Sequence, residues 1–286
     1  DPIDPPFEKE HPMYVGMLTA PFGSEPIDKI IAFATEAGIT GLELASGAGG
    51  HIDTNTFTKD EAKRVKEMSD AGGHIITSLA HYTNVCDGQA ETKENFEKVM
   101  QAAVWLGVDT VCCMAGMPVD GKTKHETIQE VVPTFYKPML AKARDMGLKL
   151  AMENWTATNI QDFSHWDLIF DVLPDENFGL NYDPSHLIWQ GIDYLAGVDM
   201  YADRIFHTHA KDTDMRDHVR RHVGYAGNGW WRYVIPGFGQ IDWGTYTERL
   251  YNIGYKGVLS IEHEDGAQGR EEGFIRGTNY LNQFVN

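Results

Sequence analysis

One pattern recurs along the chain and limits the folds that it can adopt. A segment with helical periodicity ends at a glycine, and a short apolar segment typical of a β-strand follows at once. Glycine relieves the left-handed backbone conformation that often ends a helix, which explains why it recurs at this point. The pattern appears in EAGITGLELAS (36–46), DAGGHIITSLAH (70–81), WLGVDTVCCMAG (105–116), DMGLKLAMENW (145–155) and NIGYKGVLSIEHE (252–264).

The segments before these glycines have the period of amphipathic helices. Thr58, followed by Glu61, predicts a capping box at the start of one of them. Apolar residues spaced three and four apart predict one buried face on each of two further helices. These faces are Ile27, Ile30, Ile31 and Ala34, and Phe96, Val99, Met100 and Ala103.

Three more strand-like segments complete the pattern: MYVGML (13–18), FGLNYD (178–183) and RIFHTHAKD (204–212). Eight strands that alternate with helices predict an α/β protein with a (β/α)8 TIM barrel. A doubly wound sheet would place a GxGxxG loop after its first strand, and TAPFGSEP stands there instead. We therefore expect a single barrel domain over 13–286, preceded by an N-terminal extension over 1–12.

Charge and hydropathy narrow the classes of partner. The 286 residues carry 24 basic and 42 acidic side chains, a formal net charge of −18, which would repel the phosphates of a nucleic acid. No segment approaches the roughly 20 apolar residues of a membrane span, so we expect no membrane partner. We expect a cytoplasmic protein; because the chain begins without an initiator Met, export with a removed signal is the alternative.

The three cysteines predict neither a disulfide framework nor a metal site. Two of them, Cys112 and Cys113, are adjacent within an apolar run, and there is no CxxC motif. We expect buried, inert thiols.

The segment from about 213 to 240 separates the last two predicted strands and is long for a barrel loop. Loops of this length inside a compact domain are usually functional lids or disordered inserts. The segment contains Trp230 and Trp231, and these aromatic residues favour a lid-like insertion over a solvated excursion.

Polar residues follow four consecutive predicted strands at the end where barrel enzymes carry their chemistry. These residues are Glu153, Asp183, His209 and Glu262. Side-chain alternation places Ser260 inside the barrel with Glu262, whereas Ile261 and His263 face the helices. By the same period, His207, His209 and Lys211 share one face.

Three carboxylates placed together would raise one another's pKa unless a multivalent cation held them. Each residue alone has a structural explanation, such as helix capping by Asp183, but the four together favour a metal site. Oxygen donors with one imidazole suit Mn²⁺, Mg²⁺, Co²⁺ or Zn²⁺ and leave positions for water or a chelating substrate. We predict one divalent metal ion held by Glu153, Asp183, His209 and Glu262.

The order of Glu153, DPSH (183–186), HAKD (209–212) and SIEHED (260–265) resembles the xylose isomerase-like TIM barrel family. Sugar phosphate isomerases and epimerases, ketose 3-epimerases, inosose dehydratases and apurinic-site endonucleases belong to it. The resemblance runs from about Met13 to the C-terminus. PGFGQIDW (236–243) is similar to the stretch before the last helix of the family, with Asp242 as its N-cap.

The resemblance to ketose epimerases implies an enzyme that isomerises or epimerises a sugar or keto-sugar through a metal-stabilised enediolate. Glu153 and Glu262 would act as catalytic acid and base besides holding the metal. His186 matches a substrate-contacting histidine, with support of a metal ligand as its alternative role. The implied partner is a small carbohydrate, and homo-oligomerisation is left open.

Further residues near strand ends are candidates for substrate binding. Lys211 could contact a substrate oxygen or pair with Asp183 or Asp212. Glu43 could bind a hydroxyl inside the barrel or be paired there. The other candidates are His81, Trp155, Arg216 and Arg232. The two arginines could bind a phosphate or carboxylate of the substrate, or they could balance local aspartates. Trp155 could instead pack at the rim of the barrel, and the same holds for Phe22.

Three alternatives stand beside this function. A dehydratase or lyase acting on a keto-sugar or keto-inositol would use the same enediolate route. An apurinic-site endonuclease would recruit His81 and His186 to several zinc ions, but the fourth strand ends in Cys-Cys-Met without the expected ligand. A non-catalytic sugar-binding barrel would not need the pair of glutamates.

Overall fold

A computed structural model describes residues 13–285. All eight predicted barrel strands are present, and they close a parallel barrel in the order β1-β2-β3-β4-β5-β6-β7-β10. The prediction of a (β/α)8 TIM barrel is therefore confirmed, while the extension proposed for 1–12 lies outside the described residues. The strands are β1 Tyr14–Leu18, β2 Gly41–Ala45, β3 Ile75–Ala80, β4 Thr110–Met114, β5 Lys149–Glu153, β6 Phe178–Tyr182, β7 Ile205–Ala210 and β10 Val258–Ile261.

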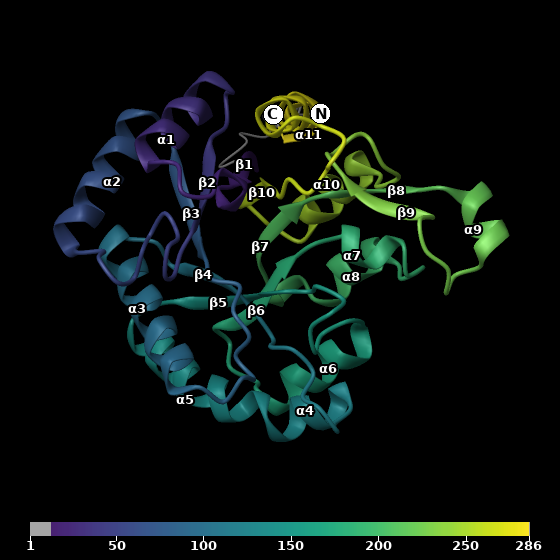
Figure 1. The fold of residues 1–286 in the computed structure, drawn as a ribbon, viewed down its shortest axis with the longest axis horizontal. Helices are drawn as coiled ribbons and strands as arrows, with labels where there is room; N and C mark the ends of the chain where they lie inside the picture. Colours follow the sequence, from purple (N-terminus) through teal and green to yellow (C-terminus); the bar gives the residue numbers. More distant parts are fainter. Residues whose placement is uncertain (1–12, 286) are drawn as a thin grey trace, which may run out of the picture.

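Helices surround the barrel, as Figure 1 shows. The two predicted apolar faces, on α1 and α3, are buried as expected. No helix within residues 13–285 combines the length and apolarity that crossing a bilayer requires. The helices are α1 Ile27–Glu36, α2 Lys59–Ala71, α3 Ala90–Leu106, α4 Lys124–Glu130, α5 Val132–Asp145, α6 Phe163–Val172, α7 Ser185–Ile188, α8 Tyr194–Met200, α9 Asp217–Val223, α10 Trp243–Asn252 and α11 Arg270–Val285, with 3₁₀ turns η1 Ala20–Phe22 and η2 Ala202–Arg204.

Local signals at the helix ends act largely as the sequence predicts. Gly107 ends α3 with a φ of 72°, the left-handed conformation expected of a glycine C-cap. Asp242 caps α10 by accepting a hydrogen bond from the Thr245 amide at 3.0 Å. Thr58 caps α2 through the Glu61 amide, but the Glu61 carboxylate pairs with Arg64. The predicted capping box is thus formed on one side.

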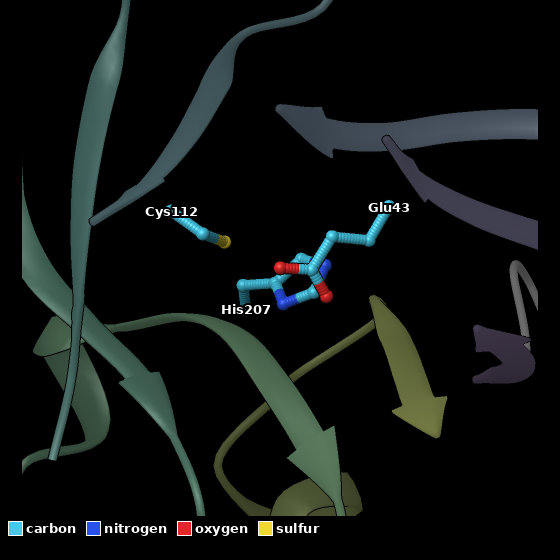
Figure 2. Close-up of side chains that lie close together, drawn as sticks. All are labelled: Glu43, Cys112 and His207. Atoms are coloured by element: carbon cyan, nitrogen blue, oxygen red, sulfur yellow. The ribbon is translucent and has the colours of Figure 1, made fainter. Parts of the chain in front are cut away.

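The interior of the barrel is polar, unlike the branched apolar filling of most TIM barrels. Glu43, Cys112 and His207 lie close together there, each buried (Figure 2). The His207 ring contacts Asn181 Oδ1 at 2.9 Å through Nδ1 and Ser78 Oγ at 3.3 Å through Nε2. Burial lowers the pKa of His207 to about 4, so the ring is neutral at pH 7.

The segment predicted as a lid-like insertion at about 213–240 forms a hairpin with a short helix. Strands β8 (Asp212–Met215) and β9 (Trp231–Val234) pair antiparallel, and α9 lies between them in sequence. The hairpin projects from the barrel in Figure 1, at the right of the view. Trp231 stacks on Trp189, with 4.3 Å between ring centroids, while Trp230 is buried. The hairpin is thereby anchored beside α7, and lid action stays a prediction.

The three thiols should react slowly with disulfide reagents in the folded protein; Cys112 and Cys113 are buried as expected, whereas Cys86 is half-buried. Burial raises the pKa of Cys86 to about 11 and that of Cys113 to about 12, and Cys112 is fully buried. At pH 8 the thiolate fraction of Cys86 is then about one in a thousand, and thiolate is the reacting species. We expect Ellman's reagent to label the native protein very slowly and all three cysteines in guanidinium chloride. Rapid labelling of the native protein at one equivalent or more would contradict this.

Candidate metal centre and active site

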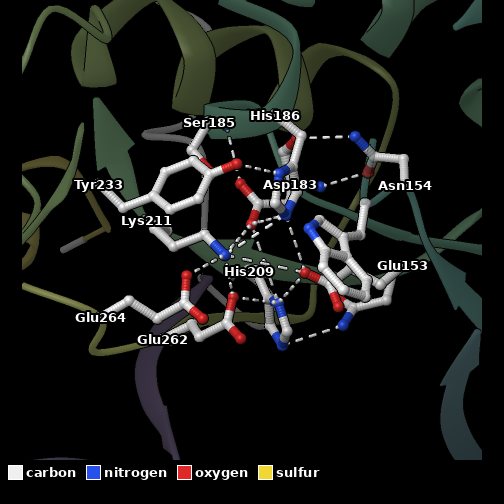
Figure 3. A network of polar contacts seen from close by, with 12 residues as sticks. Glu153, Asn154, Asp183, Ser185, His186, His209, Lys211, Tyr233, Glu262 and Glu264 are labelled. Atoms are coloured by element: carbon white, nitrogen blue, oxygen red, sulfur yellow. Dashed lines mark hydrogen bonds and ion pairs between the residues drawn. The ribbon is translucent and has the colours of Figure 1, made fainter. Parts of the chain in front are cut away.

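Four barrel strands bring Glu153, Asp183, His209 and Glu262 together, as the strand ends predict. One possible ligand atom of each lies within 4.8 Å of the others. His209 Nδ1 is 3.5 Å from Glu153 Oε1, 4.0 Å from Asp183 Oδ2 and 3.2 Å from Glu262 Oε2 (Figure 3). The residues belong to β5, the turn after β6, β7 and the turn after β10, so the closed barrel itself assembles the cluster.

Two buried atoms of this cluster make no hydrogen bond within residues 13–285. They are Asp183 Oδ2 and His209 Nδ1. The other Asp183 oxygen is occupied, since it accepts from the Ser185 amide at 2.8 Å. Buried polar atoms without hydrogen bonds are costly, and a cation held between these two would satisfy both. Three carboxylates and one imidazole are a donor set suited to a divalent ion, so the residues fit such an ion.

Lys211 brings a buried ammonium into the same cluster. Its Nζ lies 2.5 Å from Glu262 Oε2, 3.1 Å from Glu264 Oε2 and 3.3 Å from Asp183 Oδ2. Burial lowers the pKa of Lys211, but the charges of Glu262 and Asp183 outweigh it and raise the pKa well above its usual value. Of the two aspartate partners predicted, Asp183 is the one that pairs with it. Asp212 instead accepts from Trp243 Nε1 and backbone amides.

His186 stands between the cluster and the β8–β9 hairpin. Its Nε2 is 3.1 Å from Glu153 Oε1, and its Nδ1 is 2.6 Å from the Tyr233 hydroxyl. Burial raises the pKa of Glu153, but the contacts with His186 and His209 lower it well below its usual value. The sequence left two roles open for His186, contact with the substrate or support of a metal ligand. Its contact with Glu153 is the one expected of the second role.

Glu43 is paired inside the barrel, one of the two arrangements that the sequence left open. Its carboxylate lies 3.1 Å from His209 Nε2 and accepts hydrogen bonds from the Tyr82 hydroxyl at 2.8 Å and Ser260 Oγ at 2.7 Å. Burial would raise the pKa of Glu43, yet the charge of His209 and the hydrogen bonds with His209 and Ser260 lower it to about 2. The carboxylate is therefore an ion on the interior side of His209.

Sequence reasoning missed three residues that contact the site. Tyr82 lies 3.1 Å from His209 Nε2, Tyr233 contacts His186, and Glu264 pairs with Lys211. Side-chain alternation along β3 could have predicted that Tyr82 faces the interior, because Ser78, four residues earlier, faces inward to His207. Tyr233 has no such local signal, since it reaches the site only when the hairpin folds back over the barrel.

The structure does not bring His81 to the cluster. Its Nδ1 contacts the Ser46 carbonyl at 3.0 Å, and its ring packs against Phe96 of α3, outside the barrel. Trp155 lies half-buried just past the end of β5, and its carbonyl accepts from Thr158 Oγ1. Phe22 packs on Phe274, which is the rim packing expected as one explanation for it.

The two candidate arginines are neutralised by aspartates. Arg216 Nε and Arg232 Nε each lie 3.2 Å from Asp214 Oδ2, and Arg232 Nη1 lies 2.6 Å from Asp265 Oδ1. These contacts match the alternative in which the basic residues balance local acidic ones. In this arrangement both arginines are engaged with protein carboxylates, and substrate binding by them stays a prediction.

The chain has curated relatives along nearly its whole length. The uncharacterized protein YfiH of Bacillus subtilis is 25% identical over 313 residues, which covers 96% of this chain and 99% of that protein. An inosose dehydratase of Klebsiella pneumoniae is 28% identical over 262 residues, covering 85% and 84%. With an inosose dehydratase of Lacticaseibacillus casei, also 28% identical, the match spans about half of each chain, 51% and 51%.

Solved structures share the fold at low sequence identity. The probable 3-DHS dehydratase AsbF of Bacillus anthracis has a TM-score of 0.74 at 17% identity, covering 94% of this chain and 99% of its own. The 3-keto-D-glucoside 4-epimerase YcjR of E. coli has a TM-score of 0.72 at 15% identity, covering 95% of this chain and 99% of its own. The IOLI protein with a bound zinc atom has a TM-score of 0.71 at 18% identity, covering 95% of this chain and 99% of its own.

Family membership rests on a match to most of the chain. The sequence model of the family covers residues 31–284, from α1 to the end of α11, and so includes Glu153, Asp183, His209 and Glu262. The barrel closes as this family requires. The chain belongs to the xylose isomerase-like TIM barrel family.

Proposed function

We propose that the chain is a divalent-metal-dependent isomerase or epimerase of a sugar or keto-sugar, with Glu153 and Glu262 as acid and base. The observation that carries this proposal is the convergence of two buried atoms without hydrogen bonds, Asp183 Oδ2 and His209 Nδ1, beside these two glutamates. The epimerase and dehydratase names among its relatives support a carbohydrate substrate.

Glu153, Asp183, His209 and Glu262 would hold the ion. When bound, the ion would polarise a substrate carbonyl and stabilise the negative charge that develops when the adjacent C–H loses its proton. The binding of the substrate hydroxyls, and every proton transfer, then fall to side chains of the protein.

In this proposal, Glu153 and Glu262 would exchange protons with a substrate from different sides. Strands β5 and β10 are separated in the barrel by β6 and β7, so the two carboxylates approach the cluster from different directions. One glutamate removes the proton next to the carbonyl, and the other returns a proton. Return to the opposite face of the same carbon inverts it, whereas return to the neighbouring carbon interconverts an aldose and a ketose.

Neighbouring side chains hold these glutamates in place. His186 Nε2 contacts Glu153 Oε1, and Lys211 Nζ pairs with Glu262 Oε2. A fixed carboxylate within reach of the substrate is what proton transfer requires, because geometry precedes pKa in selecting a general base.

A dehydratase is the second candidate, favoured by the similarity to an inosose dehydratase over 85% of this chain. After the same proton removal, a hydroxyl β to the carbonyl would leave, so the same residues would give an unsaturated product. We do not propose an endonuclease, because His81, which that activity would need at the metal, packs against α3.

Proton exchange in heavy water tests the proposal. The metal-loaded protein is incubated with neutral ketoses and a keto-inositol in D₂O, and the substrate is followed by NMR. We expect loss of the C–H signal next to the carbonyl, with an epimer, an isomer or an enone as product identifying the reaction. EDTA-treated protein is the control. Absence of exchange across the panel with the metal-saturated protein would contradict the proposed function.

A further inference from the structure

The His209 ring is contacted on both sides by groups of different kinds. Its Nδ1 faces the metal-ligand cluster and has no hydrogen bond, whereas its Nε2 lies 3.1 Å from Glu43 Oε2. Glu43 comes from β2, which is separated from β7 in the barrel by β1 and β10, so its side chain reaches across the interior. Figure 2 shows the carboxylate extended into this space beside His207.

The donors and acceptors around His209 Nε2 determine which nitrogen carries the proton. The Glu43 carboxylate acts as an acceptor, since the Tyr82 hydroxyl and Ser260 Oγ both donate to it. The Tyr82 hydroxyl, 3.1 Å from Nε2, gives its own proton to Glu43 Oε1, and the Asn181 amide, 3.0 Å away, donates to the Tyr82 oxygen. A proton on Nε2 is therefore the arrangement that satisfies Glu43, and it leaves Nδ1 as the nitrogen that can give up its proton and bind a metal.

We propose that Glu43 is a positioning residue, whose buried carboxylate fixes the His209 ring and its tautomer so that Nδ1 can bind the metal. This inference rests on the proposed function and deepens it. An imidazole ligand whose second nitrogen donates to a carboxylate is held in orientation and made more basic, and loss of such a partner typically weakens metal binding about 10–100-fold. Tyr82 and Ser260 hold Glu43 in turn.

The competing interpretation is a second metal site formed by Glu43, Cys112 and His207, whose possible ligand atoms lie within 4.8 Å of one another. The hydrogen bonds oppose it. His207 uses both ring nitrogens, on Asn181 and Ser78, and the carboxylate of Glu43 already accepts from Tyr82 and Ser260. A metal there would have to break these contacts, whereas at the other site Asp183 Oδ2 and His209 Nδ1 make no hydrogen bond that a metal would have to break.

Metal affinity distinguishes the two interpretations. The full chain is stripped with EDTA and titrated with Mn²⁺ in a calorimeter, as wild type, Glu43→Gln and Cys112→Ala. We expect one ion per chain in all three, about 10–100-fold weaker binding in Glu43→Gln, and wild-type affinity in Cys112→Ala. Wild-type affinity in a folded Glu43→Gln, or two ions in wild type with one lost in both variants, would overturn the inference. A wild type that binds no ion would overturn the proposed function as well.

A second measurement tests the inference even if the Glu43→Gln variant does not fold. Zn²⁺-loaded wild-type protein labelled with ¹⁵N-histidine reports the state of each ring nitrogen by NMR. We expect His209 to carry its proton on Nε2 and to bind zinc through Nδ1. A proton on Nδ1, or an exchanging ring with no fixed tautomer, would show that Glu43 does not position this residue.

Discussion

Glu262→Gln should lower kcat by about 10²–10⁴-fold while leaving the fold intact, and Glu153→Gln should do the same. An amide matches the carboxylate in shape but cannot take up the substrate proton. Both side chains approach the cluster from the ends of barrel strands, where replacement by an isosteric group leaves the packed interior unchanged. The measurement is steady-state turnover of the substrate identified by proton exchange, with circular dichroism to verify folding.

Because both glutamates are also predicted to hold the metal, the variants must be assayed at saturating metal, with occupancy measured by elemental mass spectrometry. Glu248→Gln is the matched control, since it makes the same change on the exposed face of α10. It should turn over as wild type does. Near-normal kcat in both active-site variants at full occupancy would show that other groups carry the protons.

The barrel could be predicted because its signals are local. A glycine after a helical period and an apolar segment next to it mark each strand, and Gly107 at the end of α3 shows why the signal works. Because parallel strands end on one rim, residues such as Asp183 and His209 could be placed together without any knowledge of long-range contacts. The structure brings them together in this way.

Contacts between distant segments could not be predicted in the same manner. Tyr233 meets His186 only because the β8–β9 hairpin returns to the barrel, and nothing near either residue indicates that fold. His81 was selected for its position after a strand, but alternation turns it toward Phe96 and presents Tyr82 instead. The partners of a charged side chain depend on three-dimensional packing, which a strand pattern does not contain.

The Lys211 ammonium raises a related question of charge balance. It is buried among carboxylates of the metal-ligand cluster, with Nζ 3.3 Å from Asp183 Oδ2 and 2.5 Å from Glu262 Oε2, and it lies 4.5 Å from the centroid of the Tyr233 ring. A divalent ion would draw on the same oxygens. In the metal-free protein, Lys211 therefore supplies positive charge that the carboxylates need, and it competes with the ion.

Lys211→Met should accordingly destabilise the metal-free protein and strengthen metal binding. Removing one partner of a buried ion pair leaves uncompensated charge, at a cost of about 3–5 kcal/mol in the free energy of unfolding. Loss of a cation near the site should tighten Mn²⁺ binding by at least about tenfold, and added metal should then restore stability through linkage. Urea denaturation with and without EDTA, together with calorimetry, measures both effects.

Lys256→Met, which removes an exposed ammonium in the turn before β10, is the control and should change neither quantity. The two effects of Lys211→Met must appear together, because both follow from one position of the ammonium. Destabilisation without tighter metal binding would mean that Lys211 packs the site but stays clear of the ion. Unchanged stability and unchanged affinity would mean that the ammonium does not lie among the carboxylates in solution.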